Sequence, residues 1–229
     1  MNKILISNKI SRELRKSISE HGFHVVDLSD YSRFDSPVAS HADMLVYKID
    51  DHCILTYKEY YLQSKAIFDN VECEVITCNI IPSGEYPNDI ALNALKIGNT
   101  VYCKKDNAAP EIINRAATIV DVKQGYARCS CLAVDETQII TADSSMKESL
   151  ANNNISVLKI SAGNIAIEKY EYGFIGGASF VHGDTVYFFG DVYGHPDADK
   201  IIDVIQARGK KCLCLSNEPL FDYGGAVIV

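Results

Sequence analysis

A histidine, an aspartate and a cysteine stand where their side chains could carry chemistry. His41 and Asp43 are two residues apart, just before one apolar, strand-like segment. Cys129 opens another such segment, and Cys131 follows two residues later. A cysteine thiolate is a nucleophile that forms covalent intermediates, and a histidine transfers protons near neutral pH. His41, Asp43 and Cys129 are therefore the first candidates for a functional site.

Further polar residues and glycines occupy the loops that lead into other strand-like segments. Asp89, Asn93 and Gln124 lie in two of these loops. Polar side chains that face a common centre need hydrogen-bond partners or a ligand, and neighbouring loops could equally supply the partners. Gly176 and Gly177 could allow close packing near that centre. The candidate ligand-binding residues are Asp43, Asp89, Asn93, Gln124, Gly176 and Gly177.

Each candidate also has a simpler, structural interpretation. His41 could cap or satisfy a backbone group of a turn. Cys129 and Cys131, two residues apart on a strand, would face the same side and could fill the core. A reactive cysteine should lie near positive charge. The adjacent Arg128 would point to the opposite face of such a strand.

Metal and cofactor sites are not indicated. His195 is followed by Pro and Asp and is best explained as the start of a helix. Asp191 and His195 are too few ligands for a metal. The glycines of residues 173–177 lack the Lys-Ser/Thr that follows a phosphate-binding loop. We therefore expect no metal and no cofactor.

Composition narrows the class of protein. The chain has 229 residues and a net charge of −8, with no block of Lys and Arg that would suit a nucleic-acid backbone. No apolar run approaches the roughly 20 residues that cross a bilayer, and the N-terminus turns polar too early for a signal peptide. The eight cysteines include no CxxC pair. These features predict a soluble cytoplasmic protein with free thiols, with neither nucleic acid nor membrane as a partner.

One pattern of elements repeats along the chain. An amphipathic helix is followed by a short strand, a loop and a hairpin. The predicted helices are residues 11–21, 58–69, 109–120, 145–153 and 196–208. The predicted hairpins join residues 43–49 with 53–56, 91–97 with 100–103, 127–134 with 138–141, and 178–182 with 185–189.

The fifth hairpin has only one strand, residues 225–229, and its partner is available at the other end of the chain. Pairing with residues 3–7 would remove an unpaired apolar edge. The sequence therefore predicts an α/β fold: one domain over residues 1–229, built as a five-fold α/β-propeller of ββαβ-type repeats. A three-layer α/β fold is the alternative, but it would not have regular hairpins.

Four motifs together resemble a clostridial-type family of unknown function assigned to the guanidino-group-modifying enzyme, or pentein, fold. They are YPNDIALNA (86–94), VKQGYARCS (122–130), YGFIGGAS (172–179) and GHPD (194–197). The resemblance covers essentially the whole chain and implies the same five-fold propeller. The chain departs from it at Phe180, where relatives usually carry Gly.

Catalytic members of that fold use a Cys nucleophile, a His acid/base and carboxylates that hold the planar guanidinium. In them the Cys lies two repeats after the His. His41 and Cys129 have this separation, but the order is rotated by two repeats relative to those enzymes. The usual position of the nucleophile, near the C-terminus, holds only Val and Ile. Ala226 stands where an acid would follow two glycines, and Asp222 is the nearest carboxylate.

Two functional hypotheses follow. The first is a Cys-dependent hydrolase or transferase acting on a small guanidino or amidino cation. It would use His41 and Cys129 as catalytic residues and Asp43 and Asp89 to hold the cation. The second is a non-catalytic binding protein on the same fold, which the empty C-terminal position favours. For such a binding protein, the acidic net charge suits a protein or a small cationic partner better than RNA.

Overall fold

The repeating unit of the protein is an antiparallel pair of strands joined to a third, parallel strand. In the computed structural model, which describes residues 2–229, these units form an α/β fold with five three-stranded mixed sheets. In every sheet the chain crosses from the middle strand to the third through one or more α-helices, and four of the sheets are each formed by three consecutive strands. These sheets are β3 (Val46–Asp50), β4 (Cys53–Tyr57) and β5 (Glu74–Cys78); β6 (Leu95–Ile97), β7 (Thr100–Cys103) and β8 (Thr118–Asp121); β9 (Cys131–Ala133), β10 (Gln138–Thr141) and β11 (Ser156–Lys159); and β12 (Ser179–His182), β13 (Thr185–Phe188) and β14 (Lys211–Cys214).

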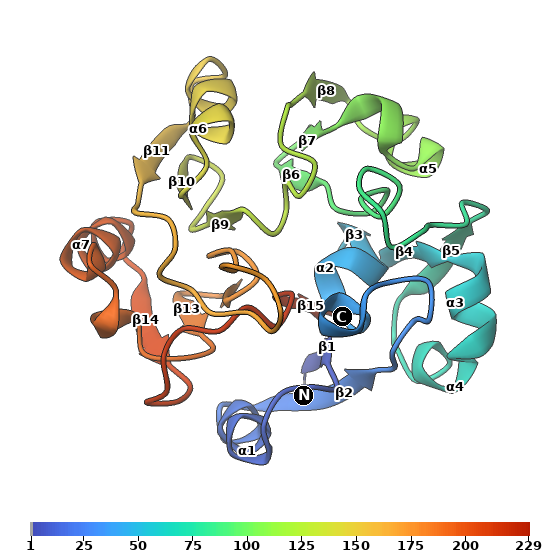
Figure 1. Ribbon diagram of the computed structural model, residues 1–229, viewed down its shortest axis with the longest axis horizontal. Helices are drawn as coiled ribbons and strands as arrows, with labels where there is room; N and C mark the ends of the chain where they lie inside the picture. Colours follow the sequence, from blue (N-terminus) through green and yellow to red (C-terminus); the bar gives the residue numbers. More distant parts are fainter. Residues whose placement is uncertain (1) are drawn as a thin grey trace.

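The fifth sheet joins the two ends of the chain. Strand β15 (Ala226–Ile228) pairs antiparallel with β1 (Asn2–Ser7), and β2 (Phe23–Leu28) pairs parallel with β1. The register sets Ile4 opposite Ile228 and Ile6 opposite Ala226. The predicted pairing of the N-terminal strand with the last strand is therefore confirmed. Figure 1 shows the five sheets arranged around a common centre.

The helices lie at the periphery, apart from one short helix at the centre (Figure 1). Helix α1 begins where the Ser11 hydroxyl accepts a hydrogen bond from the Leu14 N–H, and it buries Leu14 and Ile18, which share one face. The other outer helices are α3 (Lys58–Gln63), α4 (Lys65–Phe68), α5 (Pro110–Ile113), α6 (Ser144–Ala151) and α7 (Ala198–Ala207), and α1 covers Arg12–Glu20. No helix of residues 2–229 is long and apolar enough to cross a membrane.

Two of the predicted helices were wrong in extent. The helix expected over residues 109–120 stops at Ile113, because the β-branched run from Thr118 pairs with β7 instead. The helix expected over residues 58–69 breaks at Ser64, whose φ and ψ of −117° and 28° are not helical. In both places, strand pairing or local geometry outweighs a helical pattern.

The strands β3, β6, β9, β12 and β15, here called the inner strands, begin later than predicted. The residues just before them therefore belong to loops and turns that form the site. Residues 42–45 form the central helix α2 (Ala42–Leu45), and residues 127–130 form a turn in which the Ser130 N–H donates to the Tyr126 carbonyl. Cys129 therefore lies in a turn before β9, not on a strand, so it does not share a strand face with Cys131. The prediction that both thiols face one side of a strand was wrong.

Candidate functional site

A cavity of about 450 Å³ opens where the five loops that link successive sheets meet. Each loop supplies part of its lining. The loop from β2 to β3 contributes Phe34 and His41, and the four others contribute Asp89, Cys129, Phe174 and Asp222 together with several tyrosines. Residues distant in sequence therefore share one site. The lining residues are Phe34, Asp35, Val38, His41, Met44, Gly84, Tyr86, Asp89, Tyr126, Cys129, Ile167, Tyr170, Glu171, Tyr172, Phe174 and Asp222.

His41 stands at the start of helix α2, yet its imidazole caps no backbone group there. The ring is 3% exposed, and its Nδ1 lies 3.9 Å from Asp222 Oδ1. Burial lowers the pKa of His41 to about 3, and the positive charge of Lys9 adds to this effect. His41 is therefore neutral at pH 7 and faces the cavity, which leaves the capping interpretation without support.

Asp222 is held by backbone amides on both sides. Its Oδ2 accepts from the Phe174 N–H at 2.8 Å and its Oδ1 from the Gly224 N–H at 2.9 Å. Burial, followed by the negative charge of Asp43, raises the pKa of Asp222 to about 7. A Cβ on Gly177 would lie 1.9 Å from Asp222 Oδ1. Gly177 thus acts by leaving room for the carboxylate.

Asn93 fixes the turn that carries Cys129. Its Oδ1 accepts from the backbone N–H of Arg128 at 2.9 Å and of Cys129 at 3.2 Å, and its Nδ2 lies 2.7 Å from Cys129 Sγ. Burial raises the pKa of Cys129 well above its ordinary value, and the charges of Asp43 and Asp222 raise it further. The sulfur is therefore a neutral thiol in the ligand-free protein.

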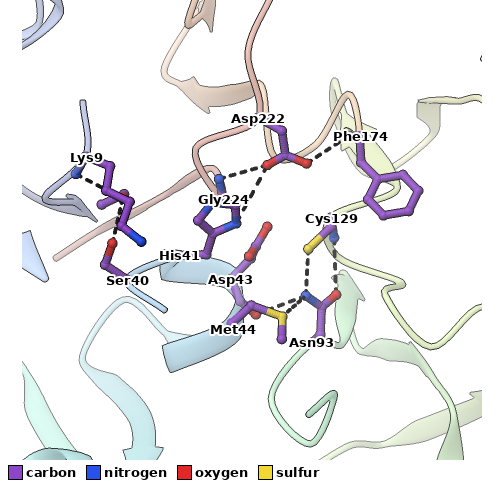
Figure 2. Close-up of polar contacts among 11 residues, drawn as sticks. Lys9, Ser40, His41, Asp43, Met44, Asn93, Cys129, Phe174, Asp222 and Gly224 are labelled. Carbon is purple, nitrogen blue, oxygen red and sulfur yellow. Dashed lines mark hydrogen bonds and ion pairs between the residues drawn. The ribbon is translucent and has the colours of Figure 1, made fainter. Parts of the chain in front are cut away.

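Asp43 lies between His41 and Cys129 (Figure 2). It is 3% exposed, and neither carboxylate oxygen has a hydrogen-bond partner among residues 2–229. Burial raises its pKa. Asp43 does not line this cavity but lines a second one of about 470 Å³, which is bordered by the inner strands and is also lined by Arg128. A buried carboxylate without hydrogen-bond partners destabilises the folded protein, and a bound cation would remove that cost, so Asp43 is suited to pair with a cation.

Asp89 and a wall of aromatic side chains form another side of the cavity. The Tyr126 hydroxyl donates to Asp89 Oδ2 at 2.6 Å, whereas Asp89 Oδ1 has no partner within the described chain. The rings of Tyr86 and Tyr126 lie with centroids 5.7 Å apart, and those of Tyr126 and Phe174 lie 6.2 Å apart. Burial raises the pKa of Asp89.

Other predicted ligand-binding residues lie outside the cavity lining. Gln124 donates to Asp143 Oδ2 at 2.7 Å and accepts from the Tyr126 N–H at 3.0 Å, so it bonds to neighbouring loops. Gly176 lets three backbone carbonyls of residues 128–131 approach, because a Cβ there would meet them at 2.4 to 2.6 Å. Phe180 packs on Tyr187 with stacked rings 4.7 Å apart. Gln124 and Gly176 therefore shape loops beside the cavity without lining it, and Phe180, which was not a predicted ligand-binding residue, belongs to the core.

Sequence reasoning missed the importance of Asp222 and of the aromatic wall. Asp222 was noted only as the carboxylate nearest to two glycines, and that Asp-x-Gly-Gly pattern was the available signal. The structure also explains the two glycines: Gly224, at φ +79°, would clash with His41 at 2.3 Å if it carried a Cβ. Among residues 2–229 no group of three His, Cys, Asp or Glu is placed to hold a metal ion, and all eight cysteines are unpaired.

A family model described as "Family of unknown function (DUF6873)" matches residues 5–227. The chain belongs to this family. No curated protein matches the chain. The family membership agrees with the resemblance carried by the four sequence motifs.

Solved structures show the fold that the family shares with guanidino-modifying enzymes. Agmatine deiminase from C. jejuni superposes with a TM-score of 0.59 at 10% identity, over 99% of this chain and 92% of that one. The amidinotransferase SxtG from Microseira wollei gives 0.55 at 10% identity, over 94% and 88%. A variant of DDAH from Pseudomonas aeruginosa, complexed with citrulline, gives 0.53 at 9% identity, over 93% and 91%. At these identities the likeness concerns the fold alone.

Proposed function

We propose that this protein is a Cys129-dependent hydrolase or transferase that acts on a small guanidino or amidino cation. The observation that carries the proposal is the convergence of His41, Cys129 and Asp222 on one cavity, with the Asp43 carboxylate beside Cys129. The three guanidino-modifying proteins of the same fold add support, because their names place amidino transfer and hydrolysis on this architecture.

The charge of the cavity supports a cationic substrate. Four of its lining residues are acidic, namely Asp35, Asp89, Glu171 and Asp222, and none of the described lining residues is Lys or Arg. A guanidinium presents planar N–H donors that match carboxylate oxygens. Asp43 and Asp222 would hold it from two sides above the Cys129 thiol.

The chemistry begins when the cation binds. Positive charge beside Asp43 and Asp222 removes much of the electrostatic penalty that raises the pKa of Cys129. The thiol proton then passes to His41, and Sγ attacks the central carbon of the guanidinium to form a carbon–sulfur bond. His41 gives the proton to the leaving nitrogen as the carbon–nitrogen bond breaks. Water or an acceptor amine then attacks the same carbon. His41 takes a proton from the attacking group and passes it to the Cys129 sulfur as the carbon–sulfur bond breaks, and in hydrolysis the remaining proton of the cationic intermediate is released to solvent.

The proposal includes a five-fold propeller in which the catalytic order is rotated. The nucleophile would stand before the inner strand of the sheet formed by β9 to β11, and the C-terminal Val227 would be a strand residue only. In a ring of five similar units, rotation preserves the relative positions of His and Cys. The binding-protein alternative would leave the four convergent groups without a chemical role.

Turnover of a panel of guanidino and amidino compounds tests the proposal. We expect release of ammonia or amine from at least one member, and loss of that activity in Cys129→Ser. Cys131→Ala is the matched control, because Cys131 is buried two residues away and does not line the cavity. Unchanged turnover in Cys129→Ser would exclude the proposed nucleophile. Binding without any turnover would leave the non-catalytic alternative.

A further inference from the structure

The cavity has a second acidic region that the proposed chemistry does not use. Asp89 is 6% exposed and lines the cavity, and its Oδ1 has no hydrogen-bond partner in residues 2–229. The negative charge of Asp35 lies close enough to Asp89 to raise its pKa further, after the larger effect of burial. An unpartnered, buried carboxylate oxygen at a cavity wall calls for a donor from a ligand.

Aromatic hydroxyls hold these two carboxylates in place. Tyr126 donates to Asp89 Oδ2 at 2.6 Å, and Tyr170 donates to Asp35 Oδ2 at 3.0 Å. The rings of both tyrosines line the cavity together with Tyr86. Carboxylates surrounded by aromatic faces form a favourable environment for an alkylammonium group, which gains charge pairing and cation–π contact.

The protein's own cations leave this region unpaired. Arg33, beside Asp35 in sequence, pairs with Glu59 at 3.1 Å, and no Lys or Arg of the described chain forms an ion pair with Asp35, Asp89 or Glu171. Lys104 lies beside this wall: its Nζ donates to the Tyr86 hydroxyl at 3.5 Å and lies 5.5 Å from the centre of the Tyr86 ring, but Lys104 is not a lining residue. A carboxylate on the ligand would therefore find no cation among the lining residues.

We propose that the region formed by Asp35, Asp89, Tyr126 and Tyr170 is a second cation subsite, which selects a guanidinoalkylamine with a distal ammonium group. This inference rests on the proposed function, because the guanidinium end occupies the region of Asp222 and Cys129. The distal ammonium donates to Asp89 Oδ1 and pairs with Asp35. Compounds with a carboxylate in place of the ammonium are disfavoured, because they would meet the charges of Asp35 and Asp89 with no cation among the lining residues.

Calorimetric titration of Cys129→Ala protein measures this selection without turnover. The probes are 4-guanidinobutylamine, butylguanidine and 4-guanidinobutanoate, which share the guanidinium and differ in the tail. We expect the amine to bind about tenfold more tightly than butylguanidine, which corresponds to about 1.4 kcal/mol, and the carboxylate to bind weakest. Adding Asp89→Asn should abolish the difference between amine and butylguanidine.

Two further variants keep the test decisive. Asp35→Asn changes an exposed residue and should reduce the preference even if Asp89→Asn fails to fold. Glu148→Gln, at an exposed position of helix α6, makes the same change in net charge far along the chain and should leave the preference intact. Equal binding of amine and butylguanidine would overturn the subsite, as would a preference that survives in both Asp variants.

The outcome separates this inference from the proposed function. Turnover of guanidines by the unmodified protein with no tail preference would sustain the hydrolase and reject the subsite. A tail preference without turnover would sustain the subsite and reject the hydrolase. Failure of all three probes to bind would reject the subsite, whereas the turnover panel alone decides the hydrolase.

Discussion

Replacing Gly177 by Ala tests how the site is assembled. A Cβ at this position would lie 1.9 Å from Asp222 Oδ1 and 2.4 Å from its Cγ. A relaxed carbon–oxygen contact is about 3.3 Å, so the carboxylate must move by roughly 1.4 Å. That movement breaks the bonds of Asp222 to the backbone N–H groups of Phe174 and Gly224.

The expected cost follows from those two bonds. Hydrogen bonds to an ionised group contribute about 1.5 to 3 kcal/mol each, and both amides would be left buried. At pH 8, above the pKa of about 7 for Asp222, we expect Gly177→Ala to lower the free energy of unfolding by about 3 to 6 kcal/mol. Urea denaturation followed by circular dichroism measures this quantity.

The control is Gly194→Ala, whose Cβ would have its nearest neighbour, Asp191 Oδ2, at 4.0 Å. A double-mutant cycle with Asp222→Ala gives a second check, because removing the carboxylate removes the clash. The double variant should be about as stable as Asp222→Ala alone. If Gly177→Ala falls within about 0.5 kcal/mol of Gly194→Ala, the packing argument for Gly177 is wrong.

Three other outcomes follow from the same geometry. The pKa of His41 is about 3 in the folded protein against an ordinary value of 6.5, so the unfolded state takes up the proton first as the pH falls. Acidification from pH 7 to pH 4 should therefore lower the free energy of unfolding of the wild type by up to about 3 kcal/mol more than that of His41→Asn. A difference between the two proteins that does not change with pH would contradict this. Asn93→Leu should lower the free energy of unfolding by about 2 to 3 kcal/mol in urea titration, because the part-buried Arg128 N–H and the buried Cys129 N–H lose their acceptor. An unchanged midpoint would refute this. Neutral iodoacetamide should alkylate Cys129 slowly at pH 7 and faster above pH 9, because burial keeps the thiol protonated; peptide mass spectrometry measures the adduct. Fast labelling at pH 7 would instead show an activated thiolate.

Local patterns were enough to predict the repeated unit of the fold. Two-residue turns between alternating apolar segments located four hairpins, and the lone apolar strand at each end predicted the pairing of β1 with β15. The ends of the helices were harder to predict from the sequence. Residues 114–120 look helical in isolation, but three β-branched or apolar residues from Thr118 onward gain more by pairing with β7. A single domain over residues 1–229 remains a prediction, and Met1 lies outside the described residues.

The site divides in the same way between local and distant causes. His41 and Cys129 could be located because both precede inner strands, where all five linking loops meet. The role of Asp222 could not be predicted, because it depends on Gly173 and Gly177, which leave space for its carboxylate from a different loop. The position of Asp43 beside Cys129 likewise depends on residues 42–45 forming a helical turn, where the apolar pattern predicted a strand.

The central claim is that Cys129 is a nucleophile in a site that recognises an amidinium-type cation. Chloroacetamidine carries that cation beside an alkylating carbon, and chloroacetamide is its neutral counterpart. Both react with protein at pH 7, and peptide mass spectrometry locates the adduct among the eight cysteines. We predict a single adduct at Cys129 for chloroacetamidine, formed at least about tenfold faster relative to chloroacetamide than with glutathione, and loss of that ratio in Asp222→Asn. Equal ratios for protein and glutathione, or adducts spread over several cysteines, would contradict the claim.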